Sequence, residues 1–305
     1  MPGYEGVELD AYRWIADQLA GHGVASLRYD KVTSGATGLG PYTDDPAALT
    51  QRSFDEVFVQ PVRDALSFLA VQPGIDADRM VLVGHSEGAL VSLAVNGDPG
   101  SAPAPTGLML IEPQYGRILD IVARQLGDQL AIADIEPSDL AALLEWIDTG
   151  IDQIRNAGPS FDPPGPVPLP TATGAVAQWQ TAISSVLFGN LWNPLAQSED
   201  ALDPVVLAGG VRIPTLVTAG TKDFNTPLVP GGPPGSGVAA LVAAFPAGCA
   251  DLVVLPDTHH ELRDIGDTDP MTLTNPASLL AFPFSSVLAD AIGTFLGSWT
   301  AAAPH

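Results

Sequence analysis

The sequence is poor in cysteine and in basic side chains, and both shortages exclude whole classes of protein. Its 305 residues include one cysteine, Cys249, so an intramolecular disulfide and a cysteine-based zinc site are excluded. Lysine and arginine together number 12 against 35 aspartates and glutamates, which gives a formal net charge of −23. Such a surface repels phosphate backbones and anionic lipid headgroups, so we expect no nucleic-acid partner.

Long apolar runs are lacking as well. No stretch of the sequence approaches the ~20 continuous apolar residues that a membrane-spanning helix needs. The first residues do not combine a basic region with an apolar stretch, as a secretory signal does. As written, the sequence predicts a cytoplasmic protein without a membrane span, and secretion would require a signal peptide upstream of Met1. Apolar residues still make up 46% of the chain, enough to bury a core.

Short apolar runs alternate with segments of helical periodicity, which is typical of a parallel sheet with crossover helices. The apolar runs are continuous and therefore predict strands that are buried on both faces. They cover residues 24–29, 80–83, 108–111, 215–219 and 252–255. Helical spacing predicts flanking helices over residues 12–20, 54–69, 89–95, 238–245 and 286–299. The predicted fold class is α/β, with a mostly parallel sheet and flanking helices.

About a hundred residues separate the third predicted strand from the fourth, far more than a crossover needs. They contain helical stretches at residues 118–130, 140–154 and 179–188 and a proline-rich run at 158–170. We interpret residues 113–205 as an inserted helical cap, and residues 1–112 and 206–305 as the core domain. Four aromatic residues of the insert could line an apolar substrate pocket, although packing in the insert's own small core is the simpler role for each. They are Trp146, Trp179, Phe188 and Trp192.

A Gly-x-Ser-x-Gly pattern lies between the second predicted strand and the helix that follows it, with Ser86 at its centre. A turn of this kind holds the serine in a strained conformation that lifts its hydroxyl above the sheet. The free N–H groups of the helix N-terminus then face the place where negative charge develops. We expect side chains at Gly84 and Gly88 to clash where strand and helix approach. Ser86 is the predicted nucleophile, and the adjacent His85 is a packing residue, because it cannot easily reach the serine hydroxyl across the turn.

A serine nucleophile needs a base within hydrogen-bond reach, and the base needs a carboxylate to fix its tautomer. Asp223 lies in the loop after the fourth predicted strand and is the predicted acid, with Glu112, directly after the third strand, in reserve. His259 and His260 follow the last strand, and one of them is the base. The histidine pair does not indicate a metal site, since no carboxylate or cysteine cluster lies at ligand spacing. We expect no metal and no cofactor.

With these residues in place, the sequence resembles the α/β-hydrolase superfamily, and within it bacterial esterases related to dienelactone hydrolases and prolyl-oligopeptidase-like enzymes. The matching pieces are residues 12–14 with 19–20, 27–31, 84–88, 220–223 and 260–263. The His-x-Leu-Arg match at residues 260–263 is the reason for preferring His260 to His259 as the base. The resemblance implies hydrolysis of a small-molecule carboxylic ester or related acyl compound, but it does not define the substrate.

The resemblance also implies elements that this sequence does not contain. Members of the family begin with about three strands before the helix that starts here at Tyr12, so the N-terminal strands are expected to be missing. The third of those strands ends in a glycine-containing loop that donates one N–H to the oxyanion hole. In this chain the backbone of Glu87 is the first predicted donor, and Gly3 is the candidate for the second.

The sequence thus predicts a serine hydrolase that cleaves a carboxylic ester through an acyl-serine intermediate, with Ser86, Asp223 and His260 as its triad. Peptidase and thioesterase activities stay open within the hydrolases. A catalytically weak or silent scaffold that binds a ligand or partner stays open outside them. The oligomeric state is not predicted.

Overall fold

The chain divides into two compact units in the computed structural model, which describes residues 10–158, 175–229, 237–273 and 275–301. Unit 1 comprises Met1–Tyr29, Pro61–Tyr115 and Pro204–His305. Unit 2 comprises Asp30–Gln60 and Gly116–Asp203. Unit 2 therefore contains most of the insert interpreted as a cap and also residues 30–60.

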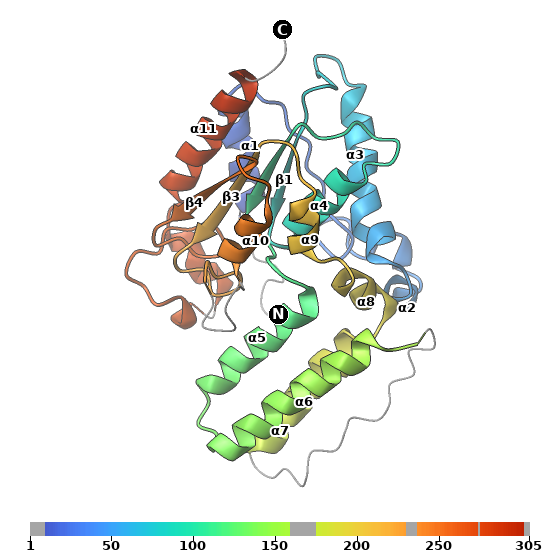
Figure 1. Ribbon diagram of the computed structural model, residues 1–305, viewed down its shortest axis with the longest axis vertical. Coiled ribbons are helices and arrows are strands. Elements are labelled where there is room, and N and C mark those ends of the chain that lie inside the picture. Colours follow the sequence, from blue (N-terminus) through green and yellow to red (C-terminus); the bar gives the residue numbers. More distant parts are fainter. Residues whose placement is uncertain (1–9, 159–174, 230–236, 274, 302–305) are drawn as a thin grey trace. The chain divides into compact units, whose positions relative to one another are not determined.

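Unit 1 is built on a four-stranded parallel sheet in the order β1-β2-β3-β4 (Figure 1). The strands are β1 (Val81–His85), β2 (Gly107–Ile111), β3 (Thr215–Gly220) and β4 (Ala250–Leu255). β2 and β3 are buried along their whole length, which explains why their sequences are continuous apolar runs. The predicted α/β class with a parallel sheet is confirmed.

Helices cover both faces of this sheet (Figure 1). On one face α1 (Ala11–Gly21) packs against α11 (Ser286–Ala301). On the other lie α4 (Glu87–Gly97), α9 (Pro204–Gly209) and α10 (Val238–Ala244); α9 contacts α4 and α10, which themselves contact the strands. On the first face, helices and strands pack together through one apolar cluster that includes Ile15, Leu19, Ile292, Leu296, Met109 and Leu216.

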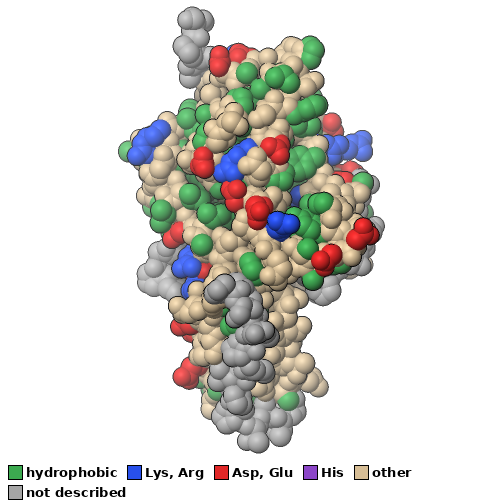
Figure 2. Space-filling model, turned by 90° about the vertical axis from the view of Figure 1, so that its right-hand side faces the viewer, with side chains coloured by type: hydrophobic (Ala, Val, Ile, Leu, Met, Phe, Trp, Pro, Cys, Tyr) green, Lys and Arg blue, Asp and Glu red, His purple; other side chains and the backbone are tan. Residues whose placement is uncertain are grey.

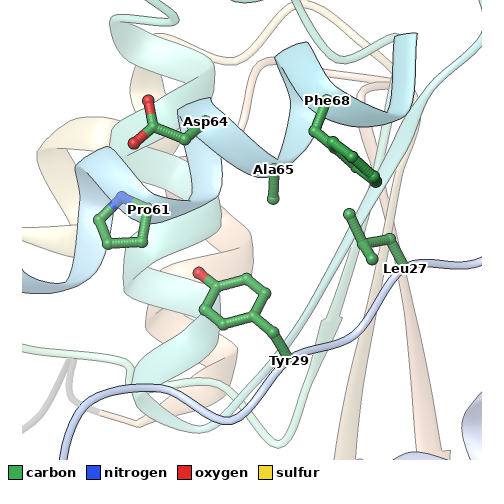
Figure 3. Close-up of a pocket in the computed structure, with 6 residues that line it drawn as sticks. All are labelled: Leu27, Tyr29, Pro61, Asp64, Ala65 and Phe68. Carbon is green, nitrogen blue, oxygen red and sulfur yellow. The ribbon is translucent and has the colours of Figure 1, made fainter. Parts of the chain in front are cut away.

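Residues 24–29 do not form the predicted strand. β1 pairs only with β2 in the described part of the chain, so residues 24–29 form no ladder of backbone hydrogen bonds with the sheet. Leu27 and Tyr29 are exposed and line a cavity of about 340 Å³ (Figure 3). The rest of the lining comes from α3 (Gln60–Ala70), through Pro61, Asp64, Ala65 and Phe68. The strand prediction was wrong: the segment includes Ser26 and Arg28, and it finds no partner strand in the described part of the chain.

Unit 2 is helical. Its three longest helices are α5 (Ile118–Ala131), α6 (Pro137–Arg155) and α7 (Ala175–Ser184). α5 and α6 cover the first two helical stretches predicted for the insert, and α7 covers the third up to Ser184. The π-helical segment η3 (Ser185–Asn190) continues α7, and η2 (Asp55–Val59) leads into α3. Two short helices, α2 (Pro46–Thr50) and α8 (Pro194–Asp200), pack against each other. The 3-10 helices among the described residues are η1 (Gly40–Tyr42), η4 (Pro270–Thr272) and η5 (Pro276–Ala281).

Charged side chains of both signs are interspersed over the face drawn in Figure 2, and no extended basic patch is seen there. The chain carries 35 acidic and 12 basic residues, so few basic side chains are available to form such a patch. In the ranges that the structure describes, no helix is both long and apolar enough to cross a bilayer.

Candidate active site

Ser86 occupies the turn between β1 and α4 in a strained conformation. Its φ of 55° and ψ of −123° are values that a residue with a side chain rarely adopts. The Ser86 N–H donates to the carbonyl of Ile111 at 3.1 Å, and the Gln114 N–H donates to the carbonyl of Ser86 at 3.1 Å. These two bonds tie the turn to the segment that follows β2. The strained serine turn indicated by the sequence pattern is therefore present.

The two glycines of the pattern are not equivalent. A β-carbon at Gly84 would lie 2.1 Å from the carbonyl oxygen of Gly88, so only glycine fits where β1 passes the start of α4. A β-carbon at Gly88 would meet nothing within 4 Å. The expected clash is confirmed at Gly84 and wrong at Gly88, because the Gly88 position faces open space.

His260 and Asp223 form a buried hydrogen-bonded pair. The Nδ1–H of His260 donates to Oδ2 of Asp223 at 2.8 Å, and the two side chains are almost completely excluded from solvent. Asp223 follows β3 and His260 follows β4, and these neighbouring parallel strands end together with Gly220 opposite Leu255. A β-carbon at Gly220 would lie 2.2 Å from the carbonyl oxygen of Thr258, so glycine is what allows the two loops to meet.

Asp223 is held as a carboxylate. It accepts hydrogen bonds from the backbone N–H groups of Asn225 (2.7 Å) and Thr226 (2.9 Å) and from the Thr226 hydroxyl (2.6 Å). Burial alone would raise the pKa of Asp223, but the charge and hydrogen bond of His260 outweigh burial and lower it. Burial alone would likewise lower the pKa of His260, and the charge and hydrogen bond of Asp223 raise it instead. The pair therefore keeps the aspartate ionised and stabilises the imidazolium that His260 becomes when it takes a proton.

His259 is placed differently from His260. It is buried, its Nδ1 accepts a hydrogen bond from the Glu261 N–H at 3.2 Å, and its ring lies edge-on to that of Phe224. Burial lowers the pKa of His259, which favours its neutral form. His260, the histidine preferred from the sequence, is the one that meets the acid.

His85 makes contacts that its interpretation as a packing residue did not predict. Its Nε2 lies 2.9 Å from the carbonyl oxygen of His260. A carbonyl can only accept, so Nε2 carries the hydrogen and Nδ1 accepts from the Tyr12 hydroxyl at 3.2 Å. The rings of His85 and His260 are 4.7 Å apart between centroids. The residue next to the serine thus fixes the backbone of the loop that carries His260.

The serine hydroxyl has no protein partner in the described part of the chain. In those residues neither Oγ of Ser86 nor Nε2 of His260 forms a hydrogen bond. Bonds of this kind often tighten only when substrate binds. Glu87, whose N–H is a predicted oxyanion donor, is the first residue of α4. Gly3, the predicted second donor, lies outside the described residues.

Glu112, the reserve acid, is buried directly after β2. Its Oε2 accepts a hydrogen bond from the Gly220 N–H at 2.8 Å, and burial and the charge of Asp223 raise its pKa. In the described residues it forms no hydrogen bond with His260, so Asp223 is the direct partner of the histidine.

The four aromatic residues proposed to line a substrate pocket lie in the apolar core of unit 2. Trp146 is buried, and the other three are half-buried. The Phe188 ring lies 6.3 Å from that of Trp146 and 5.8 Å from that of Trp192. Packing among themselves is the role that these contacts show, and lining a substrate pocket stays a prediction. Across the described residues no group of three or more histidine, cysteine or acidic side chains could hold a metal ion.

A parallel sheet with a strained serine turn after β1, an acid loop after β3 and a histidine loop after β4 defines the α/β-hydrolase fold. No protein-family model matches the sequence, and no curated protein matches it either.

Three of the solved structures that are similar to this chain have low sequence identity to it. The esterase domain of a Rhodothermus marinus protein is 18% identical, with a TM-score of 0.46 over 96% of this chain and 80% of that one. Est1E of Butyrivibrio proteoclasticus, solved with ferulic acid bound, is 13% identical, with a TM-score of 0.48 over 95% of this chain and 83% of that one. VinJ is 15% identical, with a TM-score of 0.48 over 97% and 88%.

Proposed function

We propose that this chain is a serine hydrolase that cleaves a carboxylic ester, or a related acyl bond, through an acyl-Ser86 intermediate. The observation that carries the proposal is the buried hydrogen bond from His260 Nδ1 to Asp223, formed beside the strained turn that presents Ser86. A serine outside such a setting is a weak nucleophile, and a histidine oriented by a carboxylate is the base that activates one.

The mechanism follows from these positions. Oγ of Ser86 attacks the carbonyl carbon of the substrate while Nε2 of His260 takes the hydroxyl proton. Asp223 holds Nδ1–H and stabilises the imidazolium that forms. The tetrahedral oxyanion is stabilised by the Glu87 N–H at the start of α4, with Gly3 the candidate for the second donor. His260 then passes its proton to the leaving alkoxide, and the carbon–oxygen bond to the alcohol breaks.

Deacylation repeats these steps with water. His260 takes a proton from a water molecule, the hydroxide adds to the acyl carbon, and the bond to Ser86 Oγ breaks as that oxygen regains the proton. The chain from Tyr12 through His85 to the His260 carbonyl supports both halves, because it holds the base loop against the serine turn. Such positioning is where much of the rate enhancement of intramolecular catalysis arises.

The acyl substrate is proposed to be a small molecule, with thioesters and peptides as alternative acyl donors. The half-buried rings of unit 2 (Trp179, Phe188 and Trp192) are the candidates to select an apolar acyl or aromatic group. The chain carries 12 basic residues in all, so highly anionic substrates are disfavoured.

Labelling with a fluorophosphonate probe tests the proposal, because such probes react readily only with an activated serine. We expect the wild type to be labelled on Ser86 and to hydrolyse p-nitrophenyl esters. Ser86→Ala should abolish labelling and lower kcat/KM by about 10³-fold or more. Ser67→Ala, at an exposed serine whose hydroxyl donates to the Arg63 carbonyl within α3, is the matched control and should leave both unchanged.

A folded wild type that is neither labelled nor active would support the alternative of a silent scaffold that binds a ligand or partner. The unpartnered Ser86 hydroxyl in the described structure is the observation that keeps this alternative open. Activity retained in Ser86→Ala would exclude the acyl-serine mechanism altogether.

A further inference from the structure

A second carboxyl group, that of Glu112, lies behind the Asp223–His260 pair. Glu112 is 0% exposed and follows β2 directly, with a backbone φ of 44°. A positive φ is uncommon for a residue with a side chain and persists where the surroundings enforce it. Here the backbone N–H lies 3.4 Å from the Thr218 hydroxyl, and the Thr226 hydroxyl lies 3.1 Å from the Glu112 carbonyl oxygen. The structure therefore holds this side chain firmly inside unit 1.

The surroundings of Glu112 do not suit a negative charge. No lysine or arginine in the described residues forms an ion pair with it, and its Oε1 is buried without a hydrogen-bond donor. Its Oε2 has one donor, the Gly220 N–H at 2.8 Å. An ionised carboxylate buried without a counter-charge is costly, and the usual outcome is that the group keeps its proton.

Asp223 is the opposite case. It lies beside Glu112, because the Thr226 hydroxyl lies 2.6 Å from Asp223 Oδ2 and 3.1 Å from the Glu112 carbonyl oxygen, and Glu112 Oε2 accepts from Gly220 three residues before Asp223. Four protein donors already point at Asp223, including Nδ1–H of His260. Two adjacent carboxylates repel, whereas one shared proton turns the contact into a strong charge-assisted hydrogen bond. With four donors around Asp223 and one around Glu112, the proton belongs on Glu112.

We propose that Glu112 is a positioning residue for the Asp223–His260 pair: its carboxylic acid keeps the proton and donates a hydrogen bond to the Asp223 carboxylate. The catalytic part of this inference rests on the proposed function, and the protonation does not. Burial and the charge of Asp223 both raise the pKa of Glu112, in agreement with the geometry.

The consequence for catalysis is that Asp223 is held in one orientation by a neutral carboxylic acid. A neutral donor orients Asp223 toward His260 without adding a second negative charge beside the base. The titratable groups that face this cluster are Asp223 from the loop after β3, and His259 and His260 from the loop after β4. If Glu112 is neutral, its amide analogue should reproduce its effect on the pKa of His260. If it is ionised, the amide should remove a charge and lower that pKa.

Infrared difference spectra between the full-length wild type and Glu112→Gln at neutral pH provide the direct test. We expect the carbonyl stretch of a protonated carboxylic acid in the wild type and its loss in Glu112→Gln. Glu145→Gln, at an exposed glutamate of α6, is the control and should leave the band in place. Absence of the band in the wild type, or its persistence in Glu112→Gln, overturns the proposal. If Glu112→Gln does not fold, the carboxylic-acid band of the wild type is followed as a function of pH. A band that persists at neutral pH supports the proposal, and a band that is lost below neutral pH overturns it.

The pH profile of kcat/KM tests the positioning role. Glu112→Gln should keep the acidic limb and reach a kcat within a few-fold of wild type. Glu112→Ala should lose about tenfold or more in kcat, as expected when one hydrogen bond to a charged group is removed. An acidic limb that moves to lower pH in Glu112→Gln would show that Glu112 is ionised and would overturn the proposal. Fluorophosphonate labelling of Ser86 in the same samples reports separately on the proposed function.

Discussion

The carboxylate of Asp200 joins three helices of unit 2, and its removal tests how this unit is stabilised. Asp200 is the last residue of α8, and its side chain is 1% exposed. It accepts hydrogen bonds from Nη2 of Arg117 at 2.6 Å, from Nε of Arg155 at 2.8 Å and from the Leu119 N–H at 3.0 Å. Arg117 and Leu119 lie at the start of α5, and Arg155 is the last residue of α6. The two buried carboxylate oxygens of Asp200 therefore hold α5, α6 and α8 together.

The expected cost of Asp200→Ala follows from these contacts. Removing one partner of a buried ion pair costs about 3–5 kcal/mol, and losing the acceptor at a helix N-terminus costs about 1 kcal/mol. The side chains of Arg117 and Arg155 are 36% and 22% exposed, so water can solvate part of their charge once Asp200 is removed. Arg155 also keeps its bond to Asp120. We expect Asp200→Ala to lower the free energy of unfolding by about 2–4 kcal/mol and Asp200→Asn by somewhat less.

Urea denaturation followed by circular dichroism and tryptophan fluorescence measures this cost. Three of the five tryptophans lie in unit 2, so tryptophan fluorescence reports mainly on the unfolding of that unit. Asp128→Ala is the matched control, since Asp128 is 64% exposed and pairs with Arg124 one turn away on α5. It should cost about 0.5 kcal/mol or less. If Asp200→Ala costs no more than Asp128→Ala, the buried cluster contributes nothing beyond a surface pair, and the reasoning is refuted.

Two further predictions concern unit 1. Gly84→Ala should destabilise the protein by several kcal/mol, because its β-carbon would lie 2.1 Å from a backbone oxygen, whereas Gly88→Ala should be tolerated; equal melting temperatures for the two variants would contradict this. The stabilising contribution of the Asp223–His260 pair should depend on pH at both ends. The pKa of Asp223 is lowered in the folded state, so its contribution is present above the unfolded value of about 3.9 and lost as the pH falls. The pKa of His260 is raised, so its contribution is complete below about 6.5 and lost as the pH rises through the higher folded value. The difference in unfolding free energy between wild type and Asp223→Asn should therefore be largest between about pH 4 and 6.5, and a difference that does not vary with pH would contradict the prediction.

The sequence predicted what local patterns determine and missed what depends on distant partners. Four apolar runs became β1 to β4, and in β2 and β3 burial on both faces of the parallel sheet explains the continuous apolar signal, whereas β1 and β4 are only partly buried. Residues 24–29, which Ser26 and Arg28 interrupt, form no strand and pair with no neighbour in the described residues. The Ser86 turn was predictable because strand, glycines and helix are adjacent in the sequence.

The contacts around the base were not predictable in this way. The hydrogen bonds of His85 to Tyr12 and to His260 join residues 73 and 175 positions apart, and no local pattern specifies such separations. Position in the sequence gave a hint in one case. Glu112 follows a buried strand, as Asp223 does, and parallel strands bring their carboxyl ends to one edge of the sheet.

That geometry also explains why the two carboxyl groups differ in charge. β2 and β3 are neighbours in the sheet, so the residues that follow them must meet, and two acids placed there cannot both ionise without repulsion. The loop after β3 turns sharply enough for Asp223 to accept the N–H groups of Asn225 and Thr226. The segment after β2 offers Glu112 a single N–H, that of Gly220. The charge and hydrogen bond of His260, together with the donors of its own loop, thus keep Asp223 ionised, while Glu112, which forms no hydrogen bond with His260 in the described residues, keeps the proton.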